Sequence, residues 1–335
     1  MQTLGRGTIR FNKPPRIEAY ASVVGKKEGE GPLGECFDKI EPDEYVGESN
    51  WEKAESRLQN EAITLCLQKG SVSSQEVDAA TGGDLLNQCV ATSFAVRDMN
   101  IPFLGVFGAC STMAEGLIAA SALLDGGYGS HIIASAGSHF CSAEKQFRTP
   151  LEYGSQRPPS AQWTVTGAGA VLLGFNGKIG VSAATIGAIV DKGITDANHM
   201  GSAMAPAFAD TIENHFKNIA AGPQDYDAIF SGDLGVIGKE LTRELLRQNG
   251  ICLENNYHDC GEMMFDREKQ DVHAGGSGCG CAASVLCSYV LPRLDSGEWK
   301  RVLFAATGAL LSPTTVLQGE SIPCIAHAVE LVHMD

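Results

Sequence analysis

Two stretches of this chain, 149 positions apart, carry the same pattern, and this repeat limits the possible folds more than any other feature. The first stretch is SSQEVDAATGGDLL (73–86), and the second is GPQDYDAIFSGDLG (222–235). Six residues recur at this offset: Gln75, Asp78, Ala79, Gly83, Asp84 and Leu85 return as Gln224, Asp227, Ala228, Gly232, Asp233 and Leu234. The repeat indicates that one structural unit occurs twice.

A second match extends the duplication. LDGGYGSHIIASAG (124–137) resembles LDSGEWKRVLFAATG (294–308) at an offset of 170, so about 21 extra residues lie in the second half. Each half therefore has the order helix, strand, helix, strand. Apolar strands that alternate with helices predict βαβ units and a mainly parallel sheet. We expect a layered α/β protein with two halves, 1–175 and 176–335, and with the extra segment near 239–275.

The helix that precedes the first repeat has a start signal. Ser49-x-x-Glu52 matches a capping box, in which each side chain accepts a hydrogen bond from the other residue's backbone N–H. Apolar residues then recur at spacings of three and four from Trp51 to Leu65. The equivalent stretch of the second half, AMAPAFADTIENHFKNI (203–219), is also helix-like. We expect each helix to pack one apolar face on the sheet of its half.

Cys110 lies where an apolar run, IPFLGVF (101–107), gives way to a helix-compatible stretch, STMAEGLIAASALLD (111–125). A strand, a tight turn and a helix would place the thiol at the helix start. The unpaired N–H groups and the dipole at such a start favour a thiolate, so we expect a lowered pKa at Cys110. The plain alternative is a small buried apolar residue, as most free cysteines are.

Composition limits the partners and the compartment. The formal charge of −15 argues against nucleic acid or an anionic membrane surface as the main partner. Eleven cysteines without a C-x-x-C pair fit a reducing compartment better than a disulfide framework. The sequence shows neither the long apolar run of a membrane span nor a signal peptide. We therefore expect a soluble chain of the cytoplasmic type.

The duplicated α/β halves, the cysteine at a helix start and the strand VTGAGAVLLG (165–174) together resemble the thiolase superfamily and its ketoacyl synthase III-like branch. Within that branch, the chain is similar almost throughout to the stage V sporulation protein AD (SpoVAD) family. The segments that carry this resemblance are GPLGECFDK (31–39), GDLLNQ (83–88), PFLGVFGACST (102–112), EKQFRTPLEYGSQRP (144–158), DKGITDANHMGSAMAPAFADTI (191–212), YHDCG (257–261), HAGGSGCGCAAS (273–284) and ATGALLSPTTVLQGESIPCIAH (306–327).

The resemblance implies a thiolase-like fold, in which two pseudo-symmetric halves form five layers, αβαβα. It also implies a homodimer through the sheet edge near 131–138. For function, it implies binding of dipicolinic acid (pyridine-2,6-dicarboxylic acid) and its delivery to integral membrane SpoVA subunits during sporulation. The protein would be peripheral to the spore inner membrane, and we expect segments 1–50 and 239–275 to dock it by protein contacts rather than by lipid.

The enzymes that the chain resembles use a cysteine nucleophile with a His and a further Asn, His or Cys partner. Cys110 matches the nucleophile. The partner His is expected after strand 227–230, where this chain has Ser231-Gly232-Asp233, and Cys279 stands where Asn or His is expected. A carboxylate at Asp233 would oppose a thiolate and cannot donate to an oxyanion. We therefore expect a ligand-binding protein. The alternative is an acyltransferase or ketoacyl-synthase-like condensing enzyme with Cys110 as its catalytic nucleophile.

Dipicolinate is flat and carries two carboxylates, so its site needs donors at two ends and a flat wall. Arg148 and Arg157 would supply guanidinium groups, and Tyr153 would supply the wall. Cys110 and the N–H groups of the helix after it would hold one carboxylate. The further ligand-binding candidates are Asp84, His139, Asp233, Asp259, Cys260 and Cys279. The plain alternatives are surface arginines in a solvated loop and ordinary turn chemistry at the aspartates.

We expect no resident metal or cofactor, although calcium could enter with the ligand as calcium dipicolinate and contact a carboxylate. The motif CGC (279–281) is a weak zinc signal because a second cysteine pair is missing. The glycine-rich runs GGDLL and GSGCG lack the Gly-Lys-Ser/Thr ending and the complete GxGxxG pattern of nucleotide-binding loops.

Overall fold

The two repeated units occur as equivalent helices and strands in the computed structural model, which describes residues 1–147 and 157–334. Helices α2 (Trp51–Gly70) and α6 (Met200–Ile219) each have 20 residues and keep the offset of 149 positions. Strands β5 (Ala79–Gly83) and β11 (Ala228–Ser231) keep the same offset. The duplication predicted from sequence is therefore present in the fold.

The remaining elements divide between the halves. The first half also contains β1 (Gln2–Gly5), β2 (Thr8–Arg10), β3 (Arg16–Gly25), α1 (Lys26–Gly29), β4 (Lys39–Glu41), α3 (Val90–Arg97), β6 (Phe103–Gly105), α4 (Thr112–Asp125), β7 (Ile132–Ser138), α5 (Phe140–Phe147), β8 (Trp163–Thr164) and β9 (Gly167–Gly174). The second half also contains β10 (Ile179–Ile186), α7 (Gly235–Gln248), β12 (Tyr257–Asp259), α8 (Cys260–Met264), β13 (Gly276–Ser277), α9 (Cys279–Val285), α10 (Leu291–Asp295), β14 (Arg301–Ala309), α11 (Pro313–Leu317) and β15 (Cys324–His333).

Strand pairing also repeats between the halves. β5 pairs in parallel with β6 and β7, and β11 pairs in parallel with β12 and β14. β7 then pairs antiparallel with β9, as β14 does with β15. The strand order is β12-β11-β14-β15-β10-β3-β9-β7-β5-β6. β10 and β3 join the halves by pairing Ile179 with Ile17 and Gly180 with Arg16.

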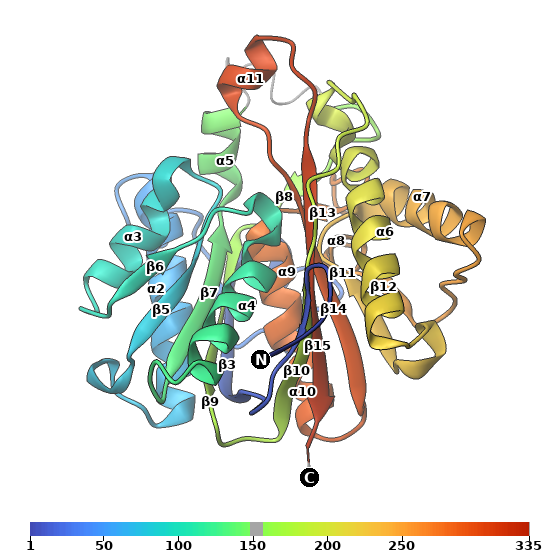
Figure 1. The fold of residues 1–335 in the computed structure, drawn as a ribbon. Coiled ribbons are helices and arrows are strands. Elements are labelled where there is room, and N and C mark those ends of the chain that lie inside the picture. Colours follow the sequence, from blue (N-terminus) through green and yellow to red (C-terminus); the bar gives the residue numbers. More distant parts are fainter. Residues whose placement is uncertain (148–156, 335) are drawn as a thin grey trace.

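Helices and strands form five layers (Figure 1). α2 packs on β3, β9 and β7 from one outer side, and α6 packs on β15, β14 and β10 from the other. α4 fills the space between the two sets of strands, because it contacts β5 and β7 as well as β14 and β15. α9 lies beside α4 and contacts β7 and β9. The αβαβα arrangement expected from the resemblance is confirmed.

The inner layer depends on small residues. Every residue of α9, CGCAASV, is buried. This helix lies so close to β9 that a Cβ added at Gly169 would come within 2.4 Å of the Ala283 carbonyl oxygen. The glycine in the glycine–alanine strand therefore permits the close approach of helix and sheet.

Two predictions from sequence are wrong. Asn50, rather than Ser49, caps α2, since its Oδ1 accepts a hydrogen bond from the backbone N of Lys53 at 2.9 Å. Residues 131–138 do not form a sheet edge, because β7 is paired on both sides, with β5 and β9. The outer strand of the first half is β6, whose three residues are all exposed.

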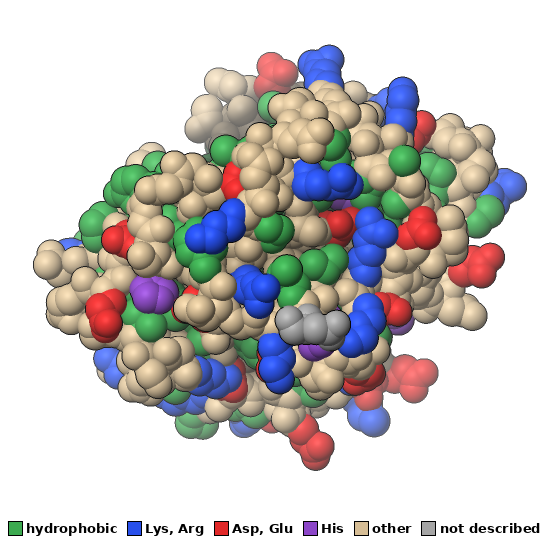
Figure 2. Space-filling view, turned by 60° about the horizontal axis from the view of Figure 1, so that its bottom comes forward, with side chains coloured by type: hydrophobic (Ala, Val, Ile, Leu, Met, Phe, Trp, Pro, Cys, Tyr) green, Lys and Arg blue, Asp and Glu red, His purple; other side chains and the backbone are tan. Residues whose placement is uncertain are grey.

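Charged side chains of both signs lie close together on one face of the molecule. Figure 2 shows Lys and Arg side chains among Asp and Glu at the end of the molecule that comes forward in that view. Arg16 lies beside the turn between β9 and β10, because its Nη1 donates to Gly177 O at 2.9 Å. Within residues 1–147 and 157–334, no helix combines the length and the apolar character that a membrane crossing requires.

Candidate functional site

Cys110 occupies a single 3₁₀ turn, Ala109–Ser111, that leads into α4. Ala109 has a φ of 50°, a conformation that a residue with a side chain adopts only at a cost in free energy. Cys110 is 5% exposed, and its Sγ lies 4.0 Å from Ser277 Oγ on β13. The turn therefore directs the thiol into the contact between the two halves.

Asp233 enters the same contact from the second half. Its Oδ2 accepts hydrogen bonds from Ser277 Oγ at 3.0 Å and from the backbone N of Gly278 at 2.9 Å. Its Oδ1 accepts one from Thr307 Oγ1 at 2.9 Å. The carboxyl group is fully buried, and burial raises its pKa to about 6. The structure thus brings together Cys110 and Asp233, two of the residues selected from sequence.

This pair is unfavourable for a thiolate. Burial raises the pKa of the Cys110 thiol well above its ordinary value, and the Asp233 carboxylate raises it further. The pKa of Cys110 is raised although the thiol lies at a helix start, so the predicted lowering of this pKa is wrong. The thiol is protonated at neutral pH and is therefore a poor nucleophile.

The two other candidate cysteines are buried as well. Cys279 Sγ donates to Gly137 O at 2.9 Å, and burial followed by the nearby Cys110 raises the pKa of its thiol. Cys260 begins α8, and burial followed by Asp259 raises the pKa of its thiol. Both thiols are neutral residues of the packed interior.

Asp84 and Asp259 bind the chain itself. Asp84 Oδ1 accepts from the backbone N of Leu86 at 2.8 Å, and its Oδ2 accepts from the N and Oγ1 of Thr92 at 2.8 and 2.7 Å. Asp259 accepts four hydrogen bonds, whose donors are Ser231 Oγ and the backbone N atoms of Leu234, Gly235 and Glu262. Each carboxylate therefore holds the start of a helix. Within residues 1–147 and 157–334, no three His, Cys, Asp or Glu side chains are grouped to hold a metal ion.

His139 fixes the segment that precedes α2. Its Nδ1 accepts a hydrogen bond from the backbone N of Cys141 at 3.1 Å, so Nε2 carries the proton and donates to Glu44 O at 2.7 Å. Burial lowers the pKa of the imidazole, which keeps this tautomer neutral. Its hydrogen bonds give His139 a structural role.

Arg157 has a buried donor that no described residue pairs with. Its side chain is 5% exposed, and Nη2 donates to Asp271 Oδ2 at 2.7 Å and to Asp271 O at 3.2 Å. Nη1 is buried and has no hydrogen-bond partner among the residues that the structure describes. Buried polar groups are almost always paired, so this donor is suited to a ligand. The two other residues predicted in this stretch, Arg148 and Tyr153, lie outside the described residues.

Sequence analysis missed two neighbours of Arg157. The guanidinium lies over Trp163, 4.6 Å from the ring centroid, and Lys27 Nζ lies 3.4 Å from a ring centroid of the same indole. Phe140 stacks on Trp163 with centroids 3.7 Å apart. We call Lys27, Arg157 and Trp163 the cation–indole cluster. No local motif marks Lys27 or Trp163, because they are far apart in the chain.

Short strands connect this cluster to the thiol site. β8 pairs with β13, so that Trp163 lies opposite Gly276 and Thr164 lies opposite Ser277. Ser277 is the residue that approaches Cys110. The cation–indole cluster is therefore one strand position from the residues around Cys110.

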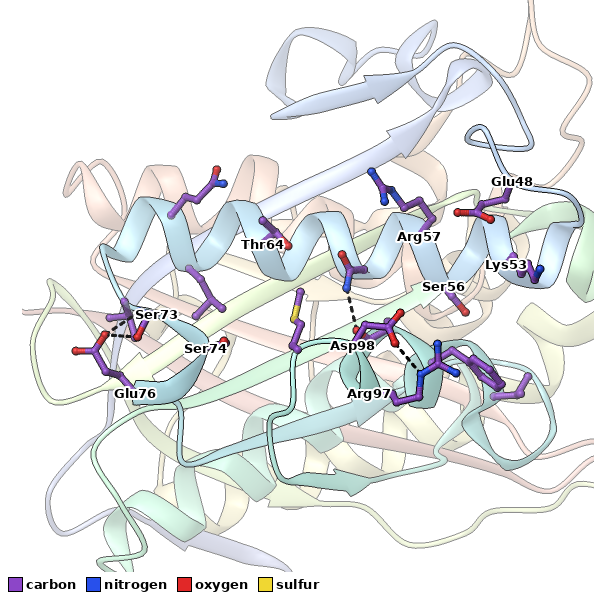
Figure 3. A pocket seen from close by; sticks show the side chains of 18 of the residues that line it. Glu48, Lys53, Ser56, Arg57, Thr64, Ser73, Ser74, Glu76, Arg97 and Asp98 are labelled. Atoms are coloured by element: carbon purple, nitrogen blue, oxygen red, sulfur yellow. Dashed lines mark hydrogen bonds and ion pairs between the residues drawn. The ribbon is translucent and has the colours of Figure 1, made fainter.

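An open groove of about 1260 Å³ lies elsewhere, between α2 and α3 (Figure 3). Some of its polar side chains pair with one another, as Arg97 Nε does with Asp98 Oδ1 at 2.7 Å and Ser73 Oγ does with Glu76 Oε2 at 2.6 Å. None of the site residues predicted from sequence lines it. The groove is therefore separate from the site around Cys110 and Arg157.

Solved structures share the fold of this chain. The 3-oxoacyl-[acyl-carrier-protein] synthase III from Aquifex aeolicus VF5 matches with a TM-score of 0.59 at 12% identity, over 95% of this chain and 100% of that one. Cerulenin-bound OleA from Xanthomonas campestris matches with a TM-score of 0.59 at 12% identity, over 97% of this chain and 98% of that one. The chain thus has the thiolase-like fold, and at such low identity the likeness concerns the fold alone.

Sequence similarity shows the family. The family model of Stage V sporulation protein AD (SpoVAD) matches residues 5–332. The Stage V sporulation protein AD of Bacillus subtilis (strain 168) is 44% identical over 330 residues, which are 98% of this chain and 97% of that protein. The chain belongs to the SpoVAD family of sporulation proteins, and the resemblance found in the sequence is confirmed.

Proposed function

We propose that this protein binds dipicolinate at the cation–indole cluster and delivers it to integral membrane SpoVA subunits during sporulation. The observation that supports this most is the Nη1 group of Arg157, a buried donor without a partner among the described residues. Dipicolinate supplies carboxylate acceptors on a flat aromatic body, and the cluster supplies cations beside an indole. Membership of the SpoVAD family supports the sporulation context.

The charges of the cluster favour an anionic ligand. Arg157 pairs with the Asp271 carboxylate, whereas among the described residues the hydrogen bond of Lys27 Nζ goes to the Asp271 carbonyl oxygen, at 3.4 Å. Burial, and then the charge of Arg157, lower the pKa of Lys27, whereas the carboxylates of Asp271, Glu28 and Glu44 raise it, so the two cations of the cluster repel each other. A ligand carboxylate would relieve this repulsion. Calcium would reduce the ligand's negative charge, so we expect free dipicolinate to bind more tightly than calcium dipicolinate.

The condensing-enzyme alternative lacks support at the site. A protonated Cys110 beside the Asp233 carboxyl group provides neither a thiolate nor a donor pair for an oxyanion at neutral pH. Incubation with short acyl-CoA thioesters followed by intact-protein mass spectrometry should therefore give no adduct on Cys110. A stoichiometric acyl adduct that is lost in Cys110→Ala would support the enzyme instead.

Isothermal titration calorimetry with dipicolinate tests the binding site. Arg157→Ala should weaken binding by about 1.5–3 kcal/mol, the range for hydrogen bonds to charged groups, and Lys27→Ala should weaken it by less. Lys26→Ala is the matched control, because this neighbouring lysine is exposed and lies outside the cluster. Cys110→Ala should have a smaller effect than Arg157→Ala. Unchanged affinity in both Arg157→Ala and Lys27→Ala would exclude the cation–indole cluster as the binding site.

We also propose a homodimer, formed through β6 rather than through residues 131–138. β6 is the outer strand of the first half, and Leu104 within it is 48% exposed. Phe103 and Phe107 are also exposed, so an apolar strand edge is available for pairing. Sedimentation velocity should show a dimer that Leu104→Glu dissociates and that Leu317→Glu, an exposed control on α11, leaves intact. A monomeric wild type at micromolar concentration would contradict the proposal.

Delivery to membrane subunits would make the protein peripheral to the spore inner membrane. Coexpression with the integral SpoVA subunits should move it into the membrane fraction, from which high pH should release it. Its presence in that fraction without those subunits would contradict docking by protein contacts.

A further inference from the structure

A strap of residues 266–273, within the extra segment of the second half, lies against the cation–indole cluster. Gln270 Nε2 donates to Lys27 O at 2.7 Å. Asp271 accepts from Arg157 Nη2 through Oδ2 at 2.7 Å, and its carbonyl oxygen lies 3.4 Å from Lys27 Nζ. The strap thus contacts both cations of the cluster.

The strap is fixed at its ends and exposed between them. Phe265, directly before it, and Val272 are buried, whereas residues 267–269 are exposed. His273 has a φ of 53°, and Gly275 has a φ of 117°. Left-handed backbone at these positions gives a sharp change of direction at the C-terminal end of the strap. Movement of the middle would therefore leave the buried ends in place.

Asp271 and Arg157 form an ion pair in which one side chain is buried and the other is exposed. The Arg157 side chain is 5% exposed, and that of Asp271 is 74% exposed. A buried guanidinium needs an anionic partner, but a carboxylate that already lies in water is only weakly held there. Water or a competing carboxylate can therefore readily replace the Asp271 carboxylate on Arg157.

We infer that Asp271 is an internal substitute for a ligand carboxylate, and that dicarboxylate ligands displace it from Arg157. This inference rests on the binding function proposed above. One ligand carboxylate takes the place of Asp271 on Nη2, and the second uses Lys27 and the Nη1 donor, which no described residue pairs with. A monocarboxylate exchanges one carboxylate for another and gains little. The exchange therefore selects for ligands with two carboxylates.

Calorimetry with dipicolinate and with its monocarboxylate analogue, picolinate, tests the exchange. Asp271→Asn should tighten dipicolinate binding about two- to fivefold, as expected for the loss of a weak competing ion pair. Glu268→Gln is the matched control, because it changes the net charge equally from an exposed position on the same strap. The gain should vanish in the double variant Arg157→Ala/Asp271→Asn. In the wild type, picolinate should bind at least tenfold more weakly than dipicolinate.

Hydrogen–deuterium exchange supplies a second measurement. Dipicolinate should accelerate exchange of the amides in 266–271, and Asp271→Asn should show this acceleration without ligand. Weaker dipicolinate binding in Asp271→Asn, an effect equal to that of Glu268→Gln, or protection of the strap by ligand would overturn the inference and leave the binding function standing. Absence of dipicolinate binding in both the wild type and Asp271→Asn would overturn the proposed function itself.

Discussion

Asp84 and Asp233 hold the same place in the repeated pattern, yet they differ in what they bind. Asp84 accepts hydrogen bonds from the backbone and the hydroxyl of Thr92 in α3. In the second half, the first amides of α7 donate instead to Asp259, which comes from β12. Asp233 is left to bind Ser277, Gly278 and Thr307 between the halves.

This difference shows that duplication preserves the position of a residue without preserving its role. The second half has an additional carboxylate, Asp259, that takes over the helix start. Asp233 can then turn toward Cys110, where it disfavours the thiolate that an acyl-transferring relative of this fold would need. The absence of helix capping by Asp233 is thus linked to the raised pKa of the Cys110 thiol.

The largest expected effect comes from removing the carboxylates that hold helices. Asp259→Ala removes the acceptor of four hydrogen bonds, three of them buried, and should lower the free energy of unfolding by about 3–5 kcal/mol. Asp84→Ala removes three hydrogen bonds and should cost about 2–4 kcal/mol. Urea denaturation measures both. Asp98→Ala, an exposed control, should change stability by less than about 0.5 kcal/mol. A smaller loss of stability in Asp259→Ala than in Asp84→Ala would contradict the view that Asp259 has taken over the capping of the helix start.

A second effect concerns the pH dependence of stability. The pKa of Asp233 is about 6 in the folded protein and 3.8 in the unfolded chain, so the folded state keeps a proton that the unfolded state releases. This group therefore destabilises the fold increasingly as pH rises from about 4 to about 6. Asp233→Asn cannot lose that proton, and its stability relative to wild type should rise by about 2.5 kcal/mol between pH 4 and pH 7. Parallel urea curves at both pH values measure it, and a constant difference would contradict the assignment.

The smallest effect concerns the reactivity of Cys110. Asp233→Asn removes the second cause of the raised thiol pKa, while burial, the larger cause, remains. Modification of Cys110 by methyl methanethiosulfonate should therefore become faster, with a pH profile shifted to lower pH. Peptide mass spectrometry follows the modified residue, and Asp84→Asn serves as the control from the equivalent position. An unshifted pH profile would show that Asp233 does not act on the thiol.

Much of the fold could be predicted because it depends on local pattern. The repeat placed α2 and α6, β5 and β11, and the halves around them. The helix cap was missed by one position because Ser49 and Asn50 are both residue types that cap helices. The outer strand was missed because β6 has only three residues, and strand order depends on pairing between distant segments.

The candidate site was only partly predictable. Arg157, Cys110 and Asp233 could be selected because each lies in a recognisable stretch of sequence. Lys27, Trp163 and Asp271 could not, because they come from α1, β8 and the strap, and no spacing in the chain relates them. The prediction of a lowered pKa at Cys110 was wrong because a helix start is a local feature of the sequence, whereas burial and the approach of Asp233 result from packing.

The sequence by itself determined the duplicated α/β architecture, the family and the absence of a histidine after strand β11, since these depend on residue identity and short-range periodicity. Only the tertiary structure decided which of two equivalent aspartates meets Cys110, which strand is exposed at the edge, and which cations converge on one indole. The physical reason is that burial, pairing and charge proximity depend on distances between residues that are remote in the chain. Those distances exist only once the five layers have packed.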